Sequence, residues 1–153
     1  MPDVRDATEA DADRLATVYR AAYRETRELG FPMKAESVSP GTVADWIREK
    51  QLLVADCEGT VVGGVRLEWT DPNRMKLSRL GVHPDRKNGG VGAALLDRAE
   101  SWARERDADA IWLTTPGEHP YLPDLYRGRG YEKTGDHPLA YREYDEITLE
   151  TQL

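Results

Sequence analysis

A glycine-rich turn lies between an apolar strand and an apolar helix in the stretch Leu80-Gly81-Val82-His83-Pro84-Asp85-Arg86-Lys87-Asn88-Gly89-Gly90-Val91-Gly92-Ala93-Ala94-Leu95-Leu96. Glycine allows positive φ angles and lets the backbone approach a ligand closely. The first N–H groups of a helix have no intrahelical partner and carry a partial positive charge. The turn therefore predicts an anion site suited to phosphates, with Lys87 as a mobile cation at its edge.

Two familiar phosphate loops do not fit this turn. A Walker loop requires Gly-Lys-Ser/Thr, and the chain has no such triplet. A Rossmann fingerprint that starts at Gly90 requires a third glycine at position 95, where the chain has Leu95. The glycine pattern by itself is also compatible with an ordinary strand-to-helix turn.

Apolar periodicity on both sides of the turn predicts an α+β domain that spans residues 1–153. Helices are expected over about 11–29, 40–50, 91–105 and 123–129, and strands over 52–55, 61–69, 75–82, 110–113 and 147–153, with a further strand from Tyr131. A strand–turn–helix–strand unit normally forms a parallel crossover. We therefore expect a mixed sheet: antiparallel strands first, then one βαβ crossover, then a C-terminal strand pair.

Composition excludes several classes of protein. The chain has 153 residues, 39% of them hydrophobic and 32% charged, and a formal net charge of −7. The periodic apolar segments exclude disorder, and the acidity argues against nucleic-acid binding, which requires basic surface. One cysteine excludes an intrachain disulfide, and one cysteine with three separated histidines offers no metal-ligand spacing. No apolar run is long enough for a membrane span, so we expect a cytoplasmic protein that does not bind membranes.

The stretch 80–96 resembles the central motif of the GNAT superfamily of N-acetyltransferases, which runs strand, Val-x-Pro, Gln/Arg-x-x-Gly-x-Gly/Ala and an Ala/Leu helix. Gly90 and Gly92 match its two glycines, and Lys87 stands where the family prefers Arg or Gln. A second match is Leu125-Tyr126-Arg127-Gly128-Arg129-Gly130-Tyr131, which resembles the family's Leu-Tyr-x-x-x-Gly-Phe/Tyr segment. The upstream order of elements fits as well, so the resemblance covers most of the chain and implies the GNAT fold.

The resemblance implies acetyl-CoA as co-substrate, without a metal. The residues expected to contact it are Leu80, Gly81, Val82, Lys87, Asn88, Gly89, Gly90, Val91, Gly92, Ala93 and His119. At His119 many members of the family carry an asparagine that contacts the cofactor, so this copy departs from the pattern there. Lys87 keeps the charge of the usual arginine but lacks its forked geometry.

The implied reaction is direct attack of an amine on the thioester of acetyl-CoA. By similarity, backbone N–H groups at Leu80 and Val82 stabilise the developing oxyanion where a bulge splays the strand, and Gly81 helps the backbone to bend. Tyr126 is the implied general acid for the departing thiolate. A phenol with a pKa near 10 is a weaker acid than a thiol near 8.5, so full transfer is uphill by roughly 2 kcal/mol. Partial donation to the sulfur is easier to defend, and Tyr126 is equally compatible with simple core packing.

The general base is less clear from the sequence, because the strand 75–82 contains no carboxylate. Glu68 on the neighbouring strand is the first candidate, although a surface charge at the edge of the sheet explains it equally well. His83 and His119 are alternatives, because an unperturbed histidine titrates near neutral pH.

Three functions remain open. The first is an N-acetyltransferase acting on a primary amine of a small molecule, an amino-acid derivative or a peptide. The second is a non-catalytic acetyl-CoA-binding sensor or interaction domain, which the absence of an obvious base would suit. The third, an unrelated α+β binding domain, conflicts with the double match at 80–96 and 125–131. The acceptor is expected to depend on residues 23–40 and on the loop after Thr134, and the sequence leaves a homodimer open.

Overall fold

The computed structural model describes residues 2–87, 89–139 and 144–153. A seven-stranded sheet with the strand order β1-β2-β3-β4-β5-β7-β6 forms its centre. The strands are β1 (Asp3–Asp6), β2 (Gln51–Cys57), β3 (Thr60–Trp69), β4 (Arg74–Val82), β5 (Ala110–Pro116), β6 (Glu132–His137) and β7 (Glu146–Gln152). The helices are α1 (Ala12–Glu28), α2 (Pro40–Glu49), α3 (Val91–Glu105) and α4 (Leu122–Arg127). The predicted mixed sheet is therefore confirmed, with element ends shifted by a few residues.

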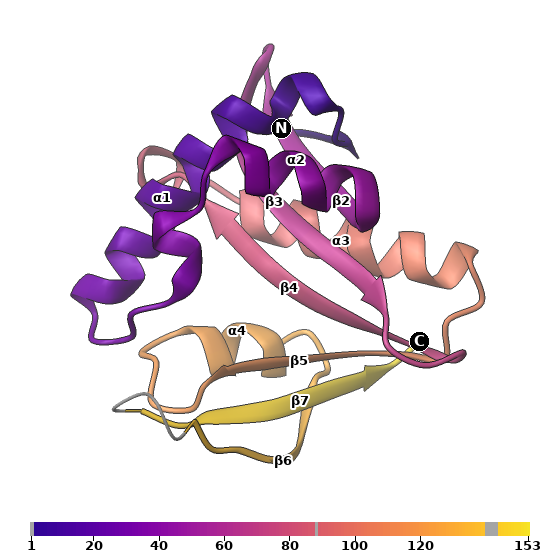
Figure 1. Ribbon diagram of the computed structural model, residues 1–153. Helices are drawn as coiled ribbons and strands as arrows, with labels where there is room; N and C mark the ends of the chain where they lie inside the picture. Colours follow the sequence, from indigo (N-terminus) through magenta and orange to yellow (C-terminus); the bar gives the residue numbers. More distant parts are fainter. Residues whose placement is uncertain (1, 88, 140–143) are drawn as a thin grey trace.

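The helices divide between the two faces of the sheet. Helices α1 and α2 cover one face and α3 covers the other (Figure 1). Leu15, Val18 and Tyr19 of α1 recur at helical spacing and are fully buried. Leu95 and Ala99 of α3 form the matching stripe on the opposite face. Two apolar layers thus hold the sheet between them, and among the described residues no helix is both long and apolar enough to span a bilayer.

The parallel pair at the centre of the sheet opens along its length. β4 and β5 pair in parallel only over Arg74–Lys76 and Ala110–Trp112. Past this point the two strands diverge (Figure 1), and β5 stays paired with β7 on its other side as far as Pro116. The predicted βαβ crossover is confirmed, and the divergence leaves one edge of β4 without a strand partner.

A β-bulge interrupts β4 in the region where it leaves β5. Arg66 of β3 pairs with Ser78, whereas the residue two positions earlier on β3 pairs with Gly81. Arg79 and Leu80 therefore stand opposite a single residue of β3, and an extra residue of this kind is left out of the ladder. Arg79 adopts a positive φ of 54°, which is unusual for a residue other than glycine.

Helix α1 holds the bulge through two tyrosines. Tyr19 donates a hydrogen bond to the carbonyl oxygen of Arg79 (2.7 Å), and Tyr23 donates one to the carbonyl oxygen of Leu80 (3.2 Å). The helix approaches so closely that a Cβ at Gly81 would lie 2.9 Å from the ring of Tyr19. Glycine at position 81 is therefore needed for this packing, and the bulge is fixed from one side.

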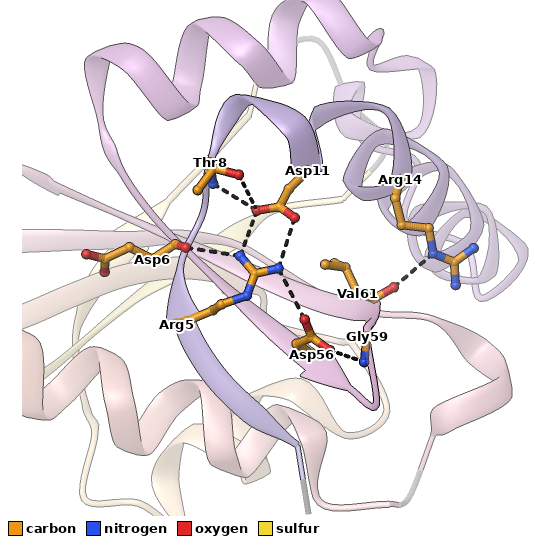
Figure 2. Close-up of polar contacts among 8 residues, drawn as sticks. All are labelled: Arg5, Asp6, Thr8, Asp11, Arg14, Asp56, Gly59 and Val61. Carbon is orange, nitrogen blue, oxygen red and sulfur yellow. Dashed lines mark hydrogen bonds and ion pairs between the residues drawn. The ribbon is translucent and has the colours of Figure 1, made fainter.

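The N-terminal strand β1 was not predicted, because Asp3–Asp6 is short and charged. The structure anchors it with Arg5, whose guanidinium contacts Asp11 at 2.8 and 3.0 Å and Asp56 at 3.2 Å (Figure 2). Asp11 also accepts a hydrogen bond from the backbone N–H of Thr8 (2.8 Å). This network joins the edge strand, the start of α1 and the end of β2, so polar contacts replace the apolar alternation that sequence patterns detect.

Candidate active site

A cleft of about 1000 Å³ opens where β4 and β5 diverge. Its walls come from α1, β4, the glycine turn, the start of α3, the end of β5, α4 and the start of β7. Segments far apart in the sequence therefore meet at one cavity. It extends from the glycine turn past the bulge to Arg66, Lys76 and Glu146.

The glycine turn forms one end of the cleft and has the features of an anion site. Gly90 precedes α3 with φ at 81°, a conformation that glycine adopts without strain. The first intrahelical hydrogen bond of α3 runs from the Ala94 N–H to the Gly90 carbonyl, so the N–H groups of the preceding turn are available to a ligand. A Cβ added at Gly92 would meet only a Val82 methyl group, at 3.9 Å. The space beside this helix terminus is open, and the residues fit a phosphate group.

Two cations, Arg86 and Lys87, line the cleft beside this helix terminus. The Lys87 ammonium donates a hydrogen bond to Glu25 of α1 (2.8 Å) and lies 5.1 Å from the ring centroid of Tyr121. The hydrogen bond to Glu25 raises the pKa of Lys87, so the side chain is charged at neutral pH. Both cations share the cleft with the helix terminus, and Arg86 carries the guanidinium that is absent at position 87.

Tyr126 lies on α4 and forms part of the cleft wall. Its side chain is 5% exposed and packs edge-to-face on Tyr131, with 5.6 Å between ring centroids. Burial raises the pKa of the Tyr126 phenol well above its ordinary value, and the neighbouring Tyr23 adds to this effect. Within the described part of the chain, the Tyr126 hydroxyl has no hydrogen-bond acceptor. It is therefore a protonated donor that is free to serve a group in the cleft.

Glu68 lies outside the lining of this cleft. Its carboxylate is 2.9 Å from the Lys50 ammonium and 3.7 Å from the Arg66 guanidinium. Burial alone would raise the pKa of Glu68, but the hydrogen bond from Lys50 and the charges of Arg66 and Lys76 outweigh it and lower the pKa. An ion-paired carboxylate of this kind is a weak base, so the geometry does not favour the role predicted for Glu68.

His119 and His83 stabilise turns. The Nδ1 atom of His119 accepts hydrogen bonds from the backbone N–H groups of Tyr121 and Leu122, both at 3.2 Å, and thereby caps the start of α4. Burial lowers the pKa of His119, as does the charge of Lys87, so the ring is neutral at pH 7. His83 accepts a hydrogen bond from the Asp85 N–H in the same manner (3.2 Å). Neither ring belongs to the cleft lining.

Most of the residues that the sequence singled out meet at this cleft. Those that line it are Leu80, Gly81, Val82, Lys87, Gly90, Val91, Gly92, Ala93 and Tyr126. Glu68, Gly89 and His119 do not line it, and Asn88 lies outside the described residues. No group of three or more His, Cys, Asp or Glu that is arranged to hold a metal occurs in the ranges described above.

Comparison with known proteins assigns the family. The sequence model of the acetyltransferase (GNAT) family matches residues 15–131, which is most of the chain. The chain belongs to this family. Its enzyme class is that of a GNAT acyltransferase, and the seven-stranded sheet with its diverging parallel pair agrees with that assignment.

Individual relatives of the GNAT family differ in the acceptors for which they are named. The chain is 29% identical over 151 residues to S-(2-succino)cysteine N-acetyltransferase of Bacillus subtilis, which covers 91% of this chain and 89% of that protein. It is 36% identical over 128 residues to mycothiol acetyltransferase of Propionibacterium freudenreichii, but this match spans 79% of the chain and only 40% of that longer protein. A solved PaiA N-acetyltransferase of Thermoplasma acidophilum in complex with coenzyme A has the same fold, with a TM-score of 0.85, 18% identity, and coverage of 100% and 99% of the two chains.

Several residues of the GNAT cleft were not predicted from the sequence. Arg66, Ser78 and Arg79 line it from β3 and β4, and Glu146 lines it from the start of β7. Their proximity depends on strand register and on the bulge, which no local pattern encodes. The positive φ at Arg79 has no sequence signal either, since glycine or asparagine usually marks such a position.

Proposed function

We propose that the protein transfers the acetyl group of acetyl-CoA to a primary amine of a small molecule, an amino-acid derivative or a peptide by direct attack on the thioester. The observation that carries the proposal is the single cleft that joins an anion site at the start of α3 to the bulge of β4 and the buried hydroxyl of Tyr126. A helix terminus that binds phosphate at one end and a hydrogen-bond donor deeper in the wall suit a thioester on a long phosphorylated carrier.

The chain's own groups suit each part of this transfer. The amine nitrogen forms a bond to the acetyl carbon, the carbon–sulfur bond breaks, and the sulfur leaves with the bonding electrons. Backbone N–H groups at the bulge of β4 stabilise the negative charge that develops on the acetyl oxygen. Tyr126 donates a hydrogen bond to the departing sulfur, and the same burial that raises the pKa of its phenol also raises the pKa of a thiol beside it.

The proton that the amine loses requires an acceptor. Among the described carboxylates that line the cleft, Glu25 pairs with Lys87 and Asp124 lies 3.8 Å from Arg127, whereas Glu146 has no ion pair with a described residue. We therefore favour Glu146 over Glu68 as the base, acting directly or through one water molecule. The curated relative in Bacillus subtilis makes S-substituted cysteines the first acceptors to test.

The proposal is tested by incubating the protein with acetyl-CoA and a panel of primary amines while free thiol release is followed. We expect thermal stabilisation by CoA and acetyl-CoA, and thiol release that depends on one class of amine. Stabilisation without turnover on any amine would support a sensor of acetyl-CoA instead. A protein that neither CoA nor acetyl-CoA stabilises would contradict both functions.

A further inference from the structure

Two guanidinium groups near the bulge of β4 lie against the same aromatic ring. The Cζ atoms of Arg66 and Arg79 lie 4.9 and 5.4 Å from the centroid of the same Trp46 ring, on the face of the sheet covered by α2. Burial lowers the pKa of Arg66, and the charge of Arg79 lowers it further. Two cations over one ring repel each other, so negative charge bound near them would stabilise the arrangement.

The protein supplies little of that negative charge. Arg66 donates a hydrogen bond from Nε to the Ser78 hydroxyl (3.1 Å) and lies 3.7 Å from Glu68, which is already bound to Lys50. Within the described ranges, the buried Nε of Arg79 has no hydrogen-bond acceptor and Arg79 forms no ion pair. A buried donor without an acceptor is unfavourable, and a guanidinium fork matches a carboxylate well.

The charge of the cleft as a whole points the same way. Its lining contains six Lys and Arg side chains and three carboxylates, in a chain whose net charge is −7. Two of these six, Arg86 and Lys87, belong to the glycine turn. Lys76 stands near the arginine pair, since Arg66 and Glu68 pair across the strands with Ser78 and Lys76. Polyamines and other polycations would be repelled from this end of the cleft.

The arginine pair is adjacent to the reacting position. Arg79 is the first bulge residue and Leu80, at which the oxyanion is expected to bind, is the next. An amino acid carries its carboxylate two bonds from its amine, and acidic side chains place a second one a few bonds further. An acid group bound by the pair would therefore keep the amine of the same molecule within reach of the acetyl carbon.

From these contacts we infer that Arg66 and Arg79 form a carboxylate-binding site for the acceptor, which is an amino acid or another amine that carries an acid group. The inference rests on the proposed function and narrows its acceptor class. The guanidinium fork of each arginine binds the acid and orients the amine, while the chemistry stays with the bulge and Tyr126. Loss of one charged hydrogen-bonding partner then affects the binding of acidic acceptors selectively.

The experiment compares an acid with its matched amide, together with an acceptor that carries further acid groups and a polyamine. The probes are S-methylcysteine, S-methylcysteinamide, S-(2-succino)cysteine and spermidine, assayed with wild type, Arg66→Gln, Arg79→Gln and the control Arg98→Gln. Arg98 lies on α3 and pairs with Glu105, so the control removes one charge outside the cleft. We expect kcat/KM for the two acids to fall about 10- to 100-fold in Arg79→Gln, mainly through KM. For the amide, kcat/KM should change less than threefold between wild type and Arg79→Gln. Comparing each probe with itself in the two proteins cancels the different reactivity of its amine. Arg98→Gln should change kcat/KM for neither the acids nor the amide.

A second measurement keeps the inference separate from turnover. Calorimetry measures the binding of the same four probes to wild-type protein that is saturated with CoA. No acetyl group is transferred under these conditions, and the result does not depend on the stability of a variant. Tighter binding of the acids than of the amide supports the carboxylate site, even if no probe is acetylated. Equal binding of the acid and the amide to wild type, an equal fall of kcat/KM for both in Arg79→Gln, or a preference for spermidine overturns the inference and leaves the proposed function standing.

Discussion

The phenol of Tyr126 combines burial with an unused hydroxyl group, and this combination predicts a catalytic effect that is separate from stability. Tyr126→Phe removes the proposed hydrogen bond to the leaving sulfur, whereas the buried ring and its packing on Tyr131 are retained. We expect kcat to fall about 10- to 100-fold, at the low end of acid–base effects, because proton donation from this phenol is only partial. The affinity for CoA and the melting temperature should stay nearly unchanged. Thiol release and calorimetry measure these quantities.

The neighbouring Tyr131 provides the matched control for that substitution. Its hydroxyl donates to the carboxylate of Glu100 (3.2 Å) in the core and lies outside the cleft lining. Tyr131→Phe should lower the free energy of unfolding by about 1–2 kcal/mol and leave kcat intact. If Tyr126→Phe kept the full rate, the phenol would have no part in the chemistry.

Substitution of two carboxylates, one at a time, distinguishes the two candidates for the general base. Glu146→Gln should lower kcat/KM about 10- to 100-fold near pH 7, because the amine is then mostly protonated and needs a proton acceptor. The loss should shrink as the pH rises toward the amine pKa, since a neutral amine reacts without a base. Glu68→Gln should leave the rate within a few fold, because Glu68 is ion-paired with Lys50 and does not line the cleft. A larger effect at Glu68 than at Glu146 would restore the base predicted from sequence.

At the level of the element, a single substitution at the start of α3 is expected to raise the stability of the fold and to lower the affinity for CoA. Gly92→Ala replaces a glycine in the first turn of the helix, so it should stabilise the fold by up to about 0.5–1 kcal/mol. The new methyl group points into the open space that a phosphate would occupy, so CoA affinity should fall about tenfold. Chemical denaturation and calorimetry measure the two effects.

Helix α2 contains the control for that change. Gly41 also lies in the first turn of a helix, and a Cβ there would meet only the Ser39 hydroxyl at 3.8 Å. Gly41→Ala should give a similar gain in stability with no loss of CoA affinity, because it lies outside the cleft lining. Unchanged CoA affinity in Gly92→Ala would show that the ligand does not approach α3 closely.

The network around β1 predicts a pH-dependent contribution to stability. The hydrogen bond from Arg5 lowers the pKa of Asp11 below its ordinary value of 3.8, and burial opposes this effect only partly. The stabilisation is therefore fully present above about pH 4 and is lost as the pH falls through the depressed pKa. Arg5→Gln should cost about 1–2 kcal/mol at pH 7, a range discounted because 35% of the Arg5 side chain is exposed.

Urea denaturation at pH 7 and at pH 3 measures that effect. The difference between wild type and Arg5→Gln should be smaller at pH 3, where Asp11 begins to take up a proton. Arg48→Gln is the control, because its partners Glu9 and Asp45 are exposed and its loss should hardly change stability. An Arg5 effect that is equal at both pH values would rule out the charged pair as its source.

Elements with periodic apolar residues were predictable from the sequence, whereas elements held by polar contacts were not. The helix over Val91–Glu105 and the strands on both sides of it bury regular stripes of apolar residues, and this pattern was sufficient to predict them. β1 depends instead on Arg5, Asp11 and Asp56, and Asp56 lies 51 positions from Arg5. Short charged edge strands of this kind have no periodic signal, so only the three-dimensional network identifies them.

The candidate site divides in the same way. The glycine turn and Tyr126 lie in contiguous motifs, so their placement at one cleft could be expected from the sequence. Arg66 and Arg79 come together only because the bulge shifts the register between β3 and β4 and brings both guanidiniums over Trp46. Glu68 has a carboxylate in a suitable strand, but its pairing with Lys50, which lies just before the neighbouring strand β2, has no local signal.

For the whole molecule, charge is distributed unevenly: an acidic chain surrounds a cleft in which most of the charged lining residues are cations. An anionic ligand is repelled at long range and attracted at short range. Between about 0.01 and 0.1 M salt the Debye length falls from about 30 to 10 Å, which screens the repulsion first. The attraction inside the cleft weakens only as the screening length approaches about 3 Å near 1 M.

This order of screening predicts a shallow minimum in the dissociation constant of CoA near 0.1 M salt. The constant should fall as salt rises from 0.01 M and should increase again toward 1 M, as measured by calorimetry in a salt series. The control Arg98→Gln removes one positive charge outside the cleft, so the net charge becomes more negative by one and the dissociation constant should rise at low salt only. A dissociation constant that rises steadily from the lowest salt would mean that the cleft charges dominate at all distances.

The positive φ of Arg79 has a consequence for the evolution of this chain. A left-handed conformation costs a residue with a Cβ roughly 1–2 kcal/mol, and asparagine tolerates it better than arginine because its side chain bonds locally. Arg79→Asn is thus expected to strengthen the fold while removing a cation from the cleft. Variants selected for heat resistance alone would drift toward asparagine at position 79, whereas selection for growth on the acceptor would retain arginine despite the strain.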